Sequence, residues 1–287
     1  MLLNINYLYK ERKLNKLFAI IASLFFVPLT LSADWTEVRI GTEGAYPPWN
    51  GTNAAGELEG AEIDMANELC DRMGVNCTFV VQDWDGIIPA LLNGKYDVII
   101  AGMSITDERK EKVDFSVGYM TDGACLVVSG DSQMASFSPS KESINLFNTD
   151  AATKQVTGQV VALLKGKTVG VQGGTIHQNF VEQYAPSAEL KTYSTQDDLN
   201  LDMGAGRLDV GLADCGAFDD YMAKADSNLT SIQPTLSGGP FGDGVGGAFR
   251  KDDDDLREMF NAAIKSALAD GTIGRISKEW FGRDISM

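Results

Sequence analysis

Apolar and polar positions alternate along this chain in two recurring patterns. Short apolar runs typical of buried strands are separated by segments whose apolar residues recur every three or four positions, the period of an amphipathic helix. In the first half, these elements are predicted at 38–41 (strand), 62–73 (helix), 77–81 (strand), 84–92 (helix) and 96–101 (strand). Strand, helix and strand at this spacing favour parallel pairing with crossover helices.

The same order of elements returns in the second half. A strand over 167–172 runs into two glycines, a helix follows over 197–203, and another strand covers 208–213. We therefore predict two Rossmann-like α/β lobes rather than one large sheet. The expected bounds are 34–120 plus 245–287 for lobe 1, 125–237 for lobe 2, and 121–124 with 238–244 for the two crossings between them.

Three stretches fall outside this pattern. Residues 130–158 are rich in Ser, Asn, Thr and Asp, which predicts a surface excursion before a helix that ends near Lys165. The glycines over 237–244 suit a crossing that must flex. The last predicted helix has Asp252–Asp255 in its first turn and ends at Gly271. Four aspartates could bind calcium, but they complement the helix dipole without a metal, so no metal is expected.

The first 33 residues have the pattern of a secretory signal peptide. Four basic residues between Lys10 and Lys16 precede an apolar run over 17–31. This run is short for a membrane span, and no stop-transfer charges follow it. We expect residues 1–33 to be removed near Ala33 and the mature protein to be periplasmic. An uncleaved anchor is the alternative.

Composition narrows the class of partner. The 287 residues are 44% hydrophobic and 9% aromatic, enough for a sizeable core. The formal net charge of −16 repels nucleic-acid phosphates and anionic lipid. Neither nucleic acid nor a membrane surface is therefore an expected partner.

The four cysteines are consistent with an oxidising compartment. Cys70 and Cys77 lie across the end of a predicted helix and the start of a strand, which allows a short-loop disulfide. Cys125 and Cys215 lie in apolar strand-like runs, where buried free thiols are expected, and the sequence alone leaves three pairings open. The one histidine, His177, is expected to be exposed, and no zinc site is predicted.

Candidate binding residues follow the predicted strands, where ligands bind in parallel α/β sheets. After the strand over 96–101, Gly102 allows a backbone amide to approach a ligand and Ser104 carries a hydroxyl. Arg109 carries a planar fork that matches a carboxylate. Because charged residues surround Arg109, a place on a helix surface is the alternative.

The second lobe offers an anion site and an acid. Gly174 and Thr175 follow a strand and open a helix, whose first amides are free to bind an anion. Asp214 follows the strand over 208–213 and can face the same cleft, although capping a helix would also explain it. The glycine spacing of a dinucleotide fingerprint is absent.

Acids and aromatic rings gather near the exit of the first strand. Glu43 and Tyr46 follow that strand, and Glu62 and Trp84 can join them. Carboxylates beside aromatic faces suit a guanidinium or ammonium ligand, whose charge they pair and whose plane they stack. The aromatic residues could equally belong to the core.

The chain resembles the polar amino-acid-binding proteins of ABC importers. The resemblance is closest to the branch with lysine/arginine/ornithine-, histidine-, octopine- and nopaline-binding proteins, and it covers residues 38–283. It rests on motifs in a fixed order, at 40–46, 62–70, 83–89, 103–109, 204–209 and 241–244. Family membership implies a type II periplasmic binding protein fold that closes by hinge motion.

The resemblance also implies roles for individual residues. Arg109 matches the arginine that binds the ligand α-carboxylate, and Asp214 matches the aspartate that binds the α-ammonium. The remaining implied site residues are Glu43 and Glu62 at the distal charge, Tyr46 and Trp84 around the side chain, and Gly102, Met103, Ser104, Gly174 and Thr175 near the carboxylate. Cys70 and Cys77 match a disulfide of the branch. Ala101, Gly102 and Ile176 depart from the family pattern.

The expected function is capture of a cationic amino acid, arginine first, then lysine, ornithine or histidine. The protein would be a monomer that delivers its ligand to the membrane permease of an ABC importer, with no cofactor and no catalysis. An opine ligand is the alternative. An enzyme of the cyclohexadienyl dehydratase type is a more distant one, since it would need a second cation where the cleft offers acids.

Overall fold

The computed structural model describes residues 35–223 and 227–287, and residues 35–287 form one compact unit. The predicted signal peptide lies outside the described residues. Within the described part of the chain, no helix has the length and apolar character needed to cross a membrane.

The first sheet draws strands from both ends of this unit. Its order is β4 (Asn76–Val81), β1 (Glu37–Thr42), β5 (Val98–Ile99), β13 (Ala248–Phe249) and β6 (Asp114–Phe115). β1 pairs in parallel with β4 and β5, whereas β13 pairs antiparallel with β5 and β6. The strand predicted over 96–101 is buried throughout, but its paired part is only the two residues of β5.

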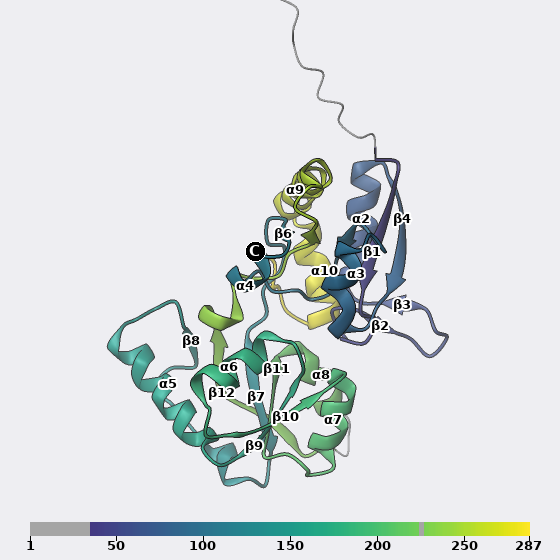
Figure 1. The fold of residues 1–287 in the computed structure, drawn as a ribbon. Helices are drawn as coiled ribbons and strands as arrows, with labels where there is room; N and C mark the ends of the chain where they lie inside the picture. The colour runs from purple at the N-terminus through teal and green to yellow at the C-terminus, as the bar shows by residue number, and fades with distance from the viewer. Residues whose placement is uncertain (1–34, 224–226) are drawn as a thin grey trace, which may run out of the picture. The chain divides into compact units, whose positions relative to one another are not determined.

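Helices and short elements surround this sheet. α2 (Ala61–Met73), α9 (Asp254–Ala269) and α10 (Thr272–Phe281) pack against one another (Figure 1). The buried side of α2, with Met65 and Leu69, joins the core that contains Ile40 and Phe260. The short elements are β2 (Gly51–Thr52), β3 (Leu58–Glu59), the 3-10 helix η1 (Trp84–Gly86), α3 (Ile87–Leu92) and α4 (Asp107–Lys110).

The second sheet is formed by the middle of the chain. Its order is β10 (Glu189–Tyr193), β9 (Thr168–Gln172), β11 (Val210–Asp214), β7 (Ala124–Ser129), β12 (Leu229–Ser237) and β8 (Ser143–Asn145). β9 pairs in parallel with β10 and β11, and β7 pairs antiparallel with β11 and β12. Its helical elements are η2 (Gln133–Ser136), α5 (Ala151–Leu164), α6 (Ile176–Tyr184), α7 (Gln196–Gly204), α8 (Gly216–Met222) and η3 (Gly239–Phe241).

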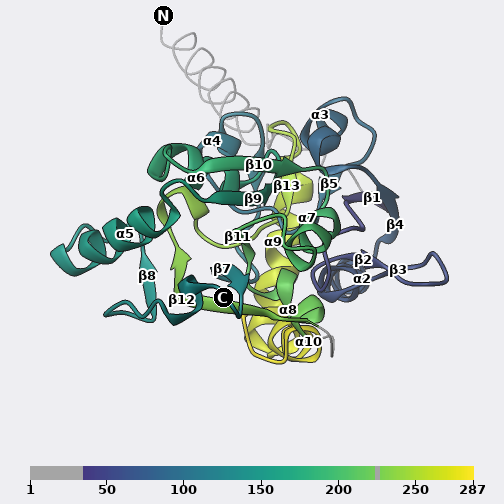
Figure 2. The same ribbon diagram turned by 90° about the horizontal axis from the view of Figure 1, so that it is seen from below.

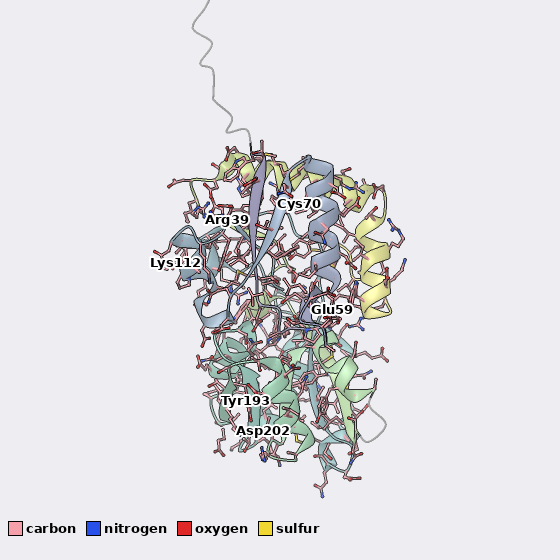
Figure 3. All side chains as sticks on the ribbon, turned by 90° about the vertical axis from the view of Figure 1, so that its right-hand side faces the viewer. Arg39, Glu59, Cys70, Lys112, Tyr193 and Asp202 are labelled. Carbon is pink, nitrogen blue, oxygen red and sulfur yellow. A yellow bond between two sulfur atoms is a disulfide. The ribbon has the colours of Figure 1, made fainter. Side chains whose placement is uncertain are left out.

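The two sheets define two α/β lobes, which confirms the predicted fold class. Figure 3 shows Arg39 and Cys70 in the lobe of the first sheet and Tyr193 and Asp202 in the lobe of the second. The residue bounds given for the lobes and their crossings stay predictions.

The segment predicted as a surface excursion over 130–158 is mostly exposed or half-buried, and the helix after it ends at Leu164, close to the predicted Lys165. β8 lies within this segment and pairs with β12, and α5 begins at Ala151. Figure 2 shows α5 beside β8. Met134 and Ile144 are buried in the core of the second lobe. These two apolar residues, isolated among polar neighbours, anchor the segment to the sheet.

The C-terminal region has one helix more than predicted. Of the four aspartates predicted in the first turn of α9, Asp254 and Asp255 lie there, whereas Asp253 occupies the N-cap position and Asp252 precedes it. Gly271, with a φ of 77°, separates it from α10, which the sequence analysis missed. The chain then runs beside residues 119–121, where the Thr121 amide donates to the Ile285 carbonyl and the Met287 amide to the Tyr119 carbonyl.

All four cysteines are bonded. Cys70 and Cys77 form the predicted short-loop disulfide between α2 and β4. The expectation of free thiols at Cys125 and Cys215 was wrong, because these two residues form a second disulfide. The apolar runs that suggested burial belong to β7 and β11, which are neighbours in the sheet, and this pairing brings their cysteines together.

Candidate binding site between the two lobes

One cavity gathers most of the predicted site residues. The empty space between its walls, including the part open to solvent, is about 310 Å³. Its lining comes from both lobes and consists of Glu43, Tyr46, Trp84, Ala101, Gly102, Ser104, Arg109, Gln172, Thr175, Ile176, His177 and Asp214.

The ends of strands position these side chains. Glu43 directly follows β1, Gln172 ends β9 and Asp214 ends β11. The Thr175 hydroxyl donates to the Gln172 carbonyl at 2.7 Å, which closes the turn between β9 and α6. The cavity therefore lies at the carboxyl ends of parallel strands, where open α/β sheets bind ligands.

Glu43 is a buried acid with a neutral partner. Its side chain accepts a hydrogen bond of 2.6 Å from the Gln172 amide across the two lobes. Burial raises the pKa of Glu43 to about 7, against the lowering effect of Gln172, and Asp83 and Asp85 raise it further. A cationic group beside Glu43 would restore the charged carboxylate.

Arg109 supplies a positive charge to the same cavity. Its Nη1 donates to the Ser104 carbonyl at 3.0 Å, and its guanidinium lies 5.2 Å from the centroid of the Trp84 ring. Burial lowers the pKa of Arg109 to about 10, so the side chain stays cationic at neutral pH. Among the described residues no ion pair neutralises Arg109, so its fork is available for a carboxylate.

Asp214 supplies a second acid. Its side chain is 9% exposed, and one carboxylate oxygen lies 3.4 Å from Nε2 of His177. The Asp214 backbone amide donates to the Tyr46 hydroxyl at 3.3 Å. Burial, together with the Asp214 charge, raises the pKa of Tyr46 well above its ordinary value, so this hydroxyl stays protonated.

His177 corrects an expectation. The sequence analysis placed it at an exposed position, but it is only 4% exposed and lines the cavity. Its ring packs against Phe241, 5.9 Å away between centroids, because η3 covers the first turn of α6. Nε2 of His177 has no hydrogen-bond partner among the described residues.

Glu62 lies outside the cavity lining. It is fully buried, and its two oxygens accept hydrogen bonds from the Gly102 amide (2.8 Å each), from Asn50 (2.8 Å) and from the Tyr119 hydroxyl. Burial raises the pKa of Glu62, against the lowering effect of these donors. In this structure Glu62 supports the loop at Gly102, which has a positive φ of 61°.

Two further predicted residues lie beside the cavity rather than in its lining. Met103 is fully buried in a neighbouring core cluster. The Gly174 amide donates to the Gln178 side chain at 2.9 Å, and its carbonyl accepts from Nε1 of Trp84 at 3.1 Å. The Gly174 amide is thus engaged within the protein instead of being free for an anion.

Four lining residues were absent from the predicted site: Ala101, Gln172, Ile176 and His177. The sequence contained a signal for Gln172, because this residue ends a strand of the second lobe. Thr42, just before Glu43, ends the corresponding strand of the first lobe. No pattern in the sequence indicates the inward direction of His177, which depends on the contact between α6 and η3.

Comparison with known proteins agrees with this geometry. Residues 38–283 match the family model of the bacterial extracellular solute-binding proteins, family 3. The chain belongs to this family. The octopine-binding periplasmic protein of Rhizobium meliloti is 36% identical, over 92% of this chain and 97% of its own. The L-arginine-binding protein of Pseudomonas aeruginosa is 37% identical, over 96% and 98%.

A solved structure extends the comparison. A periplasmic His/Glu/Gln/Arg/opine family-binding protein from Silicibacter pomeroyi, in complex with lysine, has a TM-score of 0.69 and 34% identity. The match covers 87% of this chain and 99% of that one. The resemblance inferred from the motifs is therefore confirmed: the chain is a solute-binding protein of this family, similar to periplasmic proteins that bind amino acids and opines.

Proposed function

We propose that this protein captures a cationic amino acid, arginine first, and delivers it to the permease of an ABC importer. The supporting observation is that one cavity contains two buried acids and a guanidinium that forms no ion pair with another described residue. Arg109 would bind the α-carboxylate, Asp214 the α-ammonium, and Glu43 the distal cation. Trp84 and Tyr46 would pack against the ligand side chain.

The balance of charge supports a ligand with a net charge of +1. Glu43 and Asp214 ionised with Arg109 leave one excess negative charge among these three groups. Arginine, lysine or ornithine carries two cationic groups and one carboxylate, and so neutralises the set. Because Glu62 is engaged with Gly102, Asn50 and Tyr119, the proposal assigns the distal charge to Glu43 alone.

Closure of the two lobes on the ligand is part of the proposal. Hydrogen bonds already join the lobes around the cavity: Gln172 to Glu43, Trp84 to Gly174, Asn179 to Glu108, and the Asp214 amide to the Tyr46 hydroxyl. The predicted crossings, 121–124 and 238–244, would act as the hinge. The closed monomer would then present both lobes to the permease.

A thermal-shift screen tests the ligand class. Arginine should raise the melting temperature more than glutamate, leucine or glucose does. At about 100 times its Kd, arginine should stabilise the protein by about 2.7 kcal/mol. A screen in which an acidic or aliphatic amino acid gives the largest shift would contradict the cationic assignment.

An opine is the second candidate ligand, favoured by His177. An opine carries an extra carboxylate on a substituent of its α-nitrogen. Nε2 of His177 would be the donor for this carboxylate, because it lies beside Asp214 and has no hydrogen-bond partner among the described residues. Calorimetry with arginine and octopine separates the two candidates. Tighter binding of octopine, with little dependence on Asp214, would replace the arginine assignment.

Binding rather than catalysis is also favoured by the cavity. A dehydratase acting on a dianionic substrate would need a second cation. Arg109 is the one guanidinium or ammonium group among the described residues that line the cavity. Incubation with prephenate or arogenate should give no product.

A further inference from the structure

We propose that the Cys125–Cys215 disulfide is a positioning element of the binding site, which fixes Asp214 where it meets the ligand α-ammonium. This inference rests on the proposed function, because it assumes that Asp214 binds that group. It assigns Cys125 and Cys215 a part in ligand affinity, beyond a contribution to the stability of the fold.

The register of the second sheet places the disulfide next to Asp214. In the antiparallel pairing of β7 and β11, Ala213 lies opposite Cys125 and Asp214 opposite Ala124. Asp214 is the last paired residue of β11, and Cys215 follows it. The Cys215 amide donates to the Gly123 carbonyl at 2.8 Å, and α8 begins one residue later.

Asp214 needs such support because few groups hold its carboxylate. His177, at 3.4 Å, and the Tyr46 hydroxyl lie beside it, and the charges of Arg109 and Asp122 act on it as well. An ammonium ligand requires the carboxylate at hydrogen-bond distance in a buried cleft. At the end of a strand, backbone pairing frays more readily than in its middle, and the disulfide ties this end of β11 to β7 covalently.

The same link connects the binding site with one of the predicted crossings. Oδ2 of Asp122 accepts a hydrogen bond of 2.7 Å from the Gly216 amide, and Oδ1 accepts one of 2.9 Å from Arg283. Residues 122–125 are therefore attached to residues 215–216 by two backbone-donated hydrogen bonds and one disulfide. Loss of the disulfide loosens Asp214 relative to the crossing on which closure depends.

The other disulfide provides a matched control. Cys70 and Cys77 join the end of α2 to β4, and neither residue lines the cavity. Replacing both by alanine removes a disulfide of the same protein without touching β7, β11 or Asp214.

The experiment compares two double variants of the mature protein, Cys125→Ala with Cys215→Ala and Cys70→Ala with Cys77→Ala. Calorimetry measures the Kd of arginine and of 5-guanidinopentanoate, which is arginine without its α-amino group. The first variant should bind arginine about tenfold more weakly, since a loosened site residue loses a charged hydrogen bond. It should bind 5-guanidinopentanoate within about threefold of the unmodified protein. The control variant should bind both ligands within about threefold as well.

The other possible outcomes of this experiment contradict either the positioning role or the proposed function on which it rests. Unchanged arginine affinity in the Cys125/Cys215 variant, or an equal loss for both ligands, overturns the positioning role. An equal arginine loss in the two variants also overturns it, because the effect would then follow from loss of any disulfide. If the unmodified protein binds arginine no better than 5-guanidinopentanoate, the assignment of Asp214 in the proposed function is wrong and the inference fails with it.

Discussion

Two glutamates of the same cleft region show how the environment of a residue decides its role. Glu43 accepts one hydrogen bond from a neutral amide and lines the cavity, whereas Glu62 is surrounded by donors in the core of the first lobe. Both were predicted at the distal charge of the ligand. Of the two, Glu43 lines the cavity and Glu62 does not, and their roles in ligand binding stay predictions.

Replacement of Glu43 by glutamine should weaken arginine binding and remove its pH dependence. In the ligand-free protein the pKa of Glu43 is about 7, so the carboxyl is increasingly protonated as the pH falls below that value. Arginine affinity should fall with it, by up to about tenfold per pH unit. Calorimetry between pH 5.5 and 8 should show this slope in the unmodified protein and a flat profile in Glu43→Gln. A ligand with a neutral side chain should lose no affinity in the variant.

Removal of either protein charge that pairs with the α-carboxylate or the α-ammonium of the ligand should weaken binding strongly. Arg109→Ala or Asp214→Ala leaves a ligand charge unpaired in a buried cleft, which costs about 2–5 kcal/mol. Each variant should therefore bind arginine at least about 30-fold more weakly in calorimetry. If Asp214→Ala retains full affinity, the ligand is not held as an α-amino acid, whatever the fold.

At the scale of elements, pairing with strands distant in the chain decided features that the local sequence pattern did not predict. β5 lies in the middle of its sheet, with β1 on one side and β13, which returns from the C-terminal part of the chain, on the other, and the whole of 96–101 is buried. β8 forms in a polar segment because β12 offers it a partner. Cys125 and Cys215 meet for the same reason, since β7 and β11 are adjacent.

The two disulfides should differ in their contribution to stability. Cys125 and Cys215 are separated by 90 residues, and Cys70 and Cys77 by seven. In the chain-entropy model the longer loop contributes about 4–5 kcal/mol and the shorter about 2–3 kcal/mol. Urea unfolding of the two alanine double variants should rank them in this order. A larger loss in the Cys70/Cys77 variant would show that loop length does not govern the difference.

The whole molecule carries buried acids whose protonation affects folding. Burial raises the pKa of Glu43, Glu62 and Asp122 above their ordinary values. Between pH 4.5 and about 7 the folded protein therefore holds protons that the unfolded chain has released. Stability must fall as the pH rises through this window, because it rises only where the unfolded state binds more protons.

The ligand-free protein should thus be more stable at pH 5 than at pH 7. Glu43 alone, with its pKa moved from 4.5 to about 7, should account for about 2 kcal/mol of the difference between these two pH values. Urea unfolding at the two pH values measures the difference, and Glu43→Gln should reduce it. Saturating arginine should also reduce it, since the ligand favours the ionised carboxylate. Equal or greater stability at pH 7 in the ligand-free protein would refute the prediction.

The sequence by itself determined the alternation of strands and helices, and with it the two α/β lobes. It also located Glu43, Arg109, Thr175 and Asp214, because residues that follow parallel strands gather at one edge of a sheet. The Cys70–Cys77 pairing was accessible for a similar reason, since seven residues separate the two along the chain. These features depend on periodicity and on short separations, which a sequence displays directly.

Only the tertiary structure decided the inward direction of His177, the withdrawal of Glu62 into the core and the Cys125–Cys215 bond. Each depends on a contact between segments far apart in the chain: α6 with η3, Glu62 with Tyr119, and β7 with β11. A local pattern shows that a side chain is polar or lies near a strand end. Which neighbour it meets is settled by packing, because the burial and hydrogen bonding of a polar group are properties of its complete surroundings.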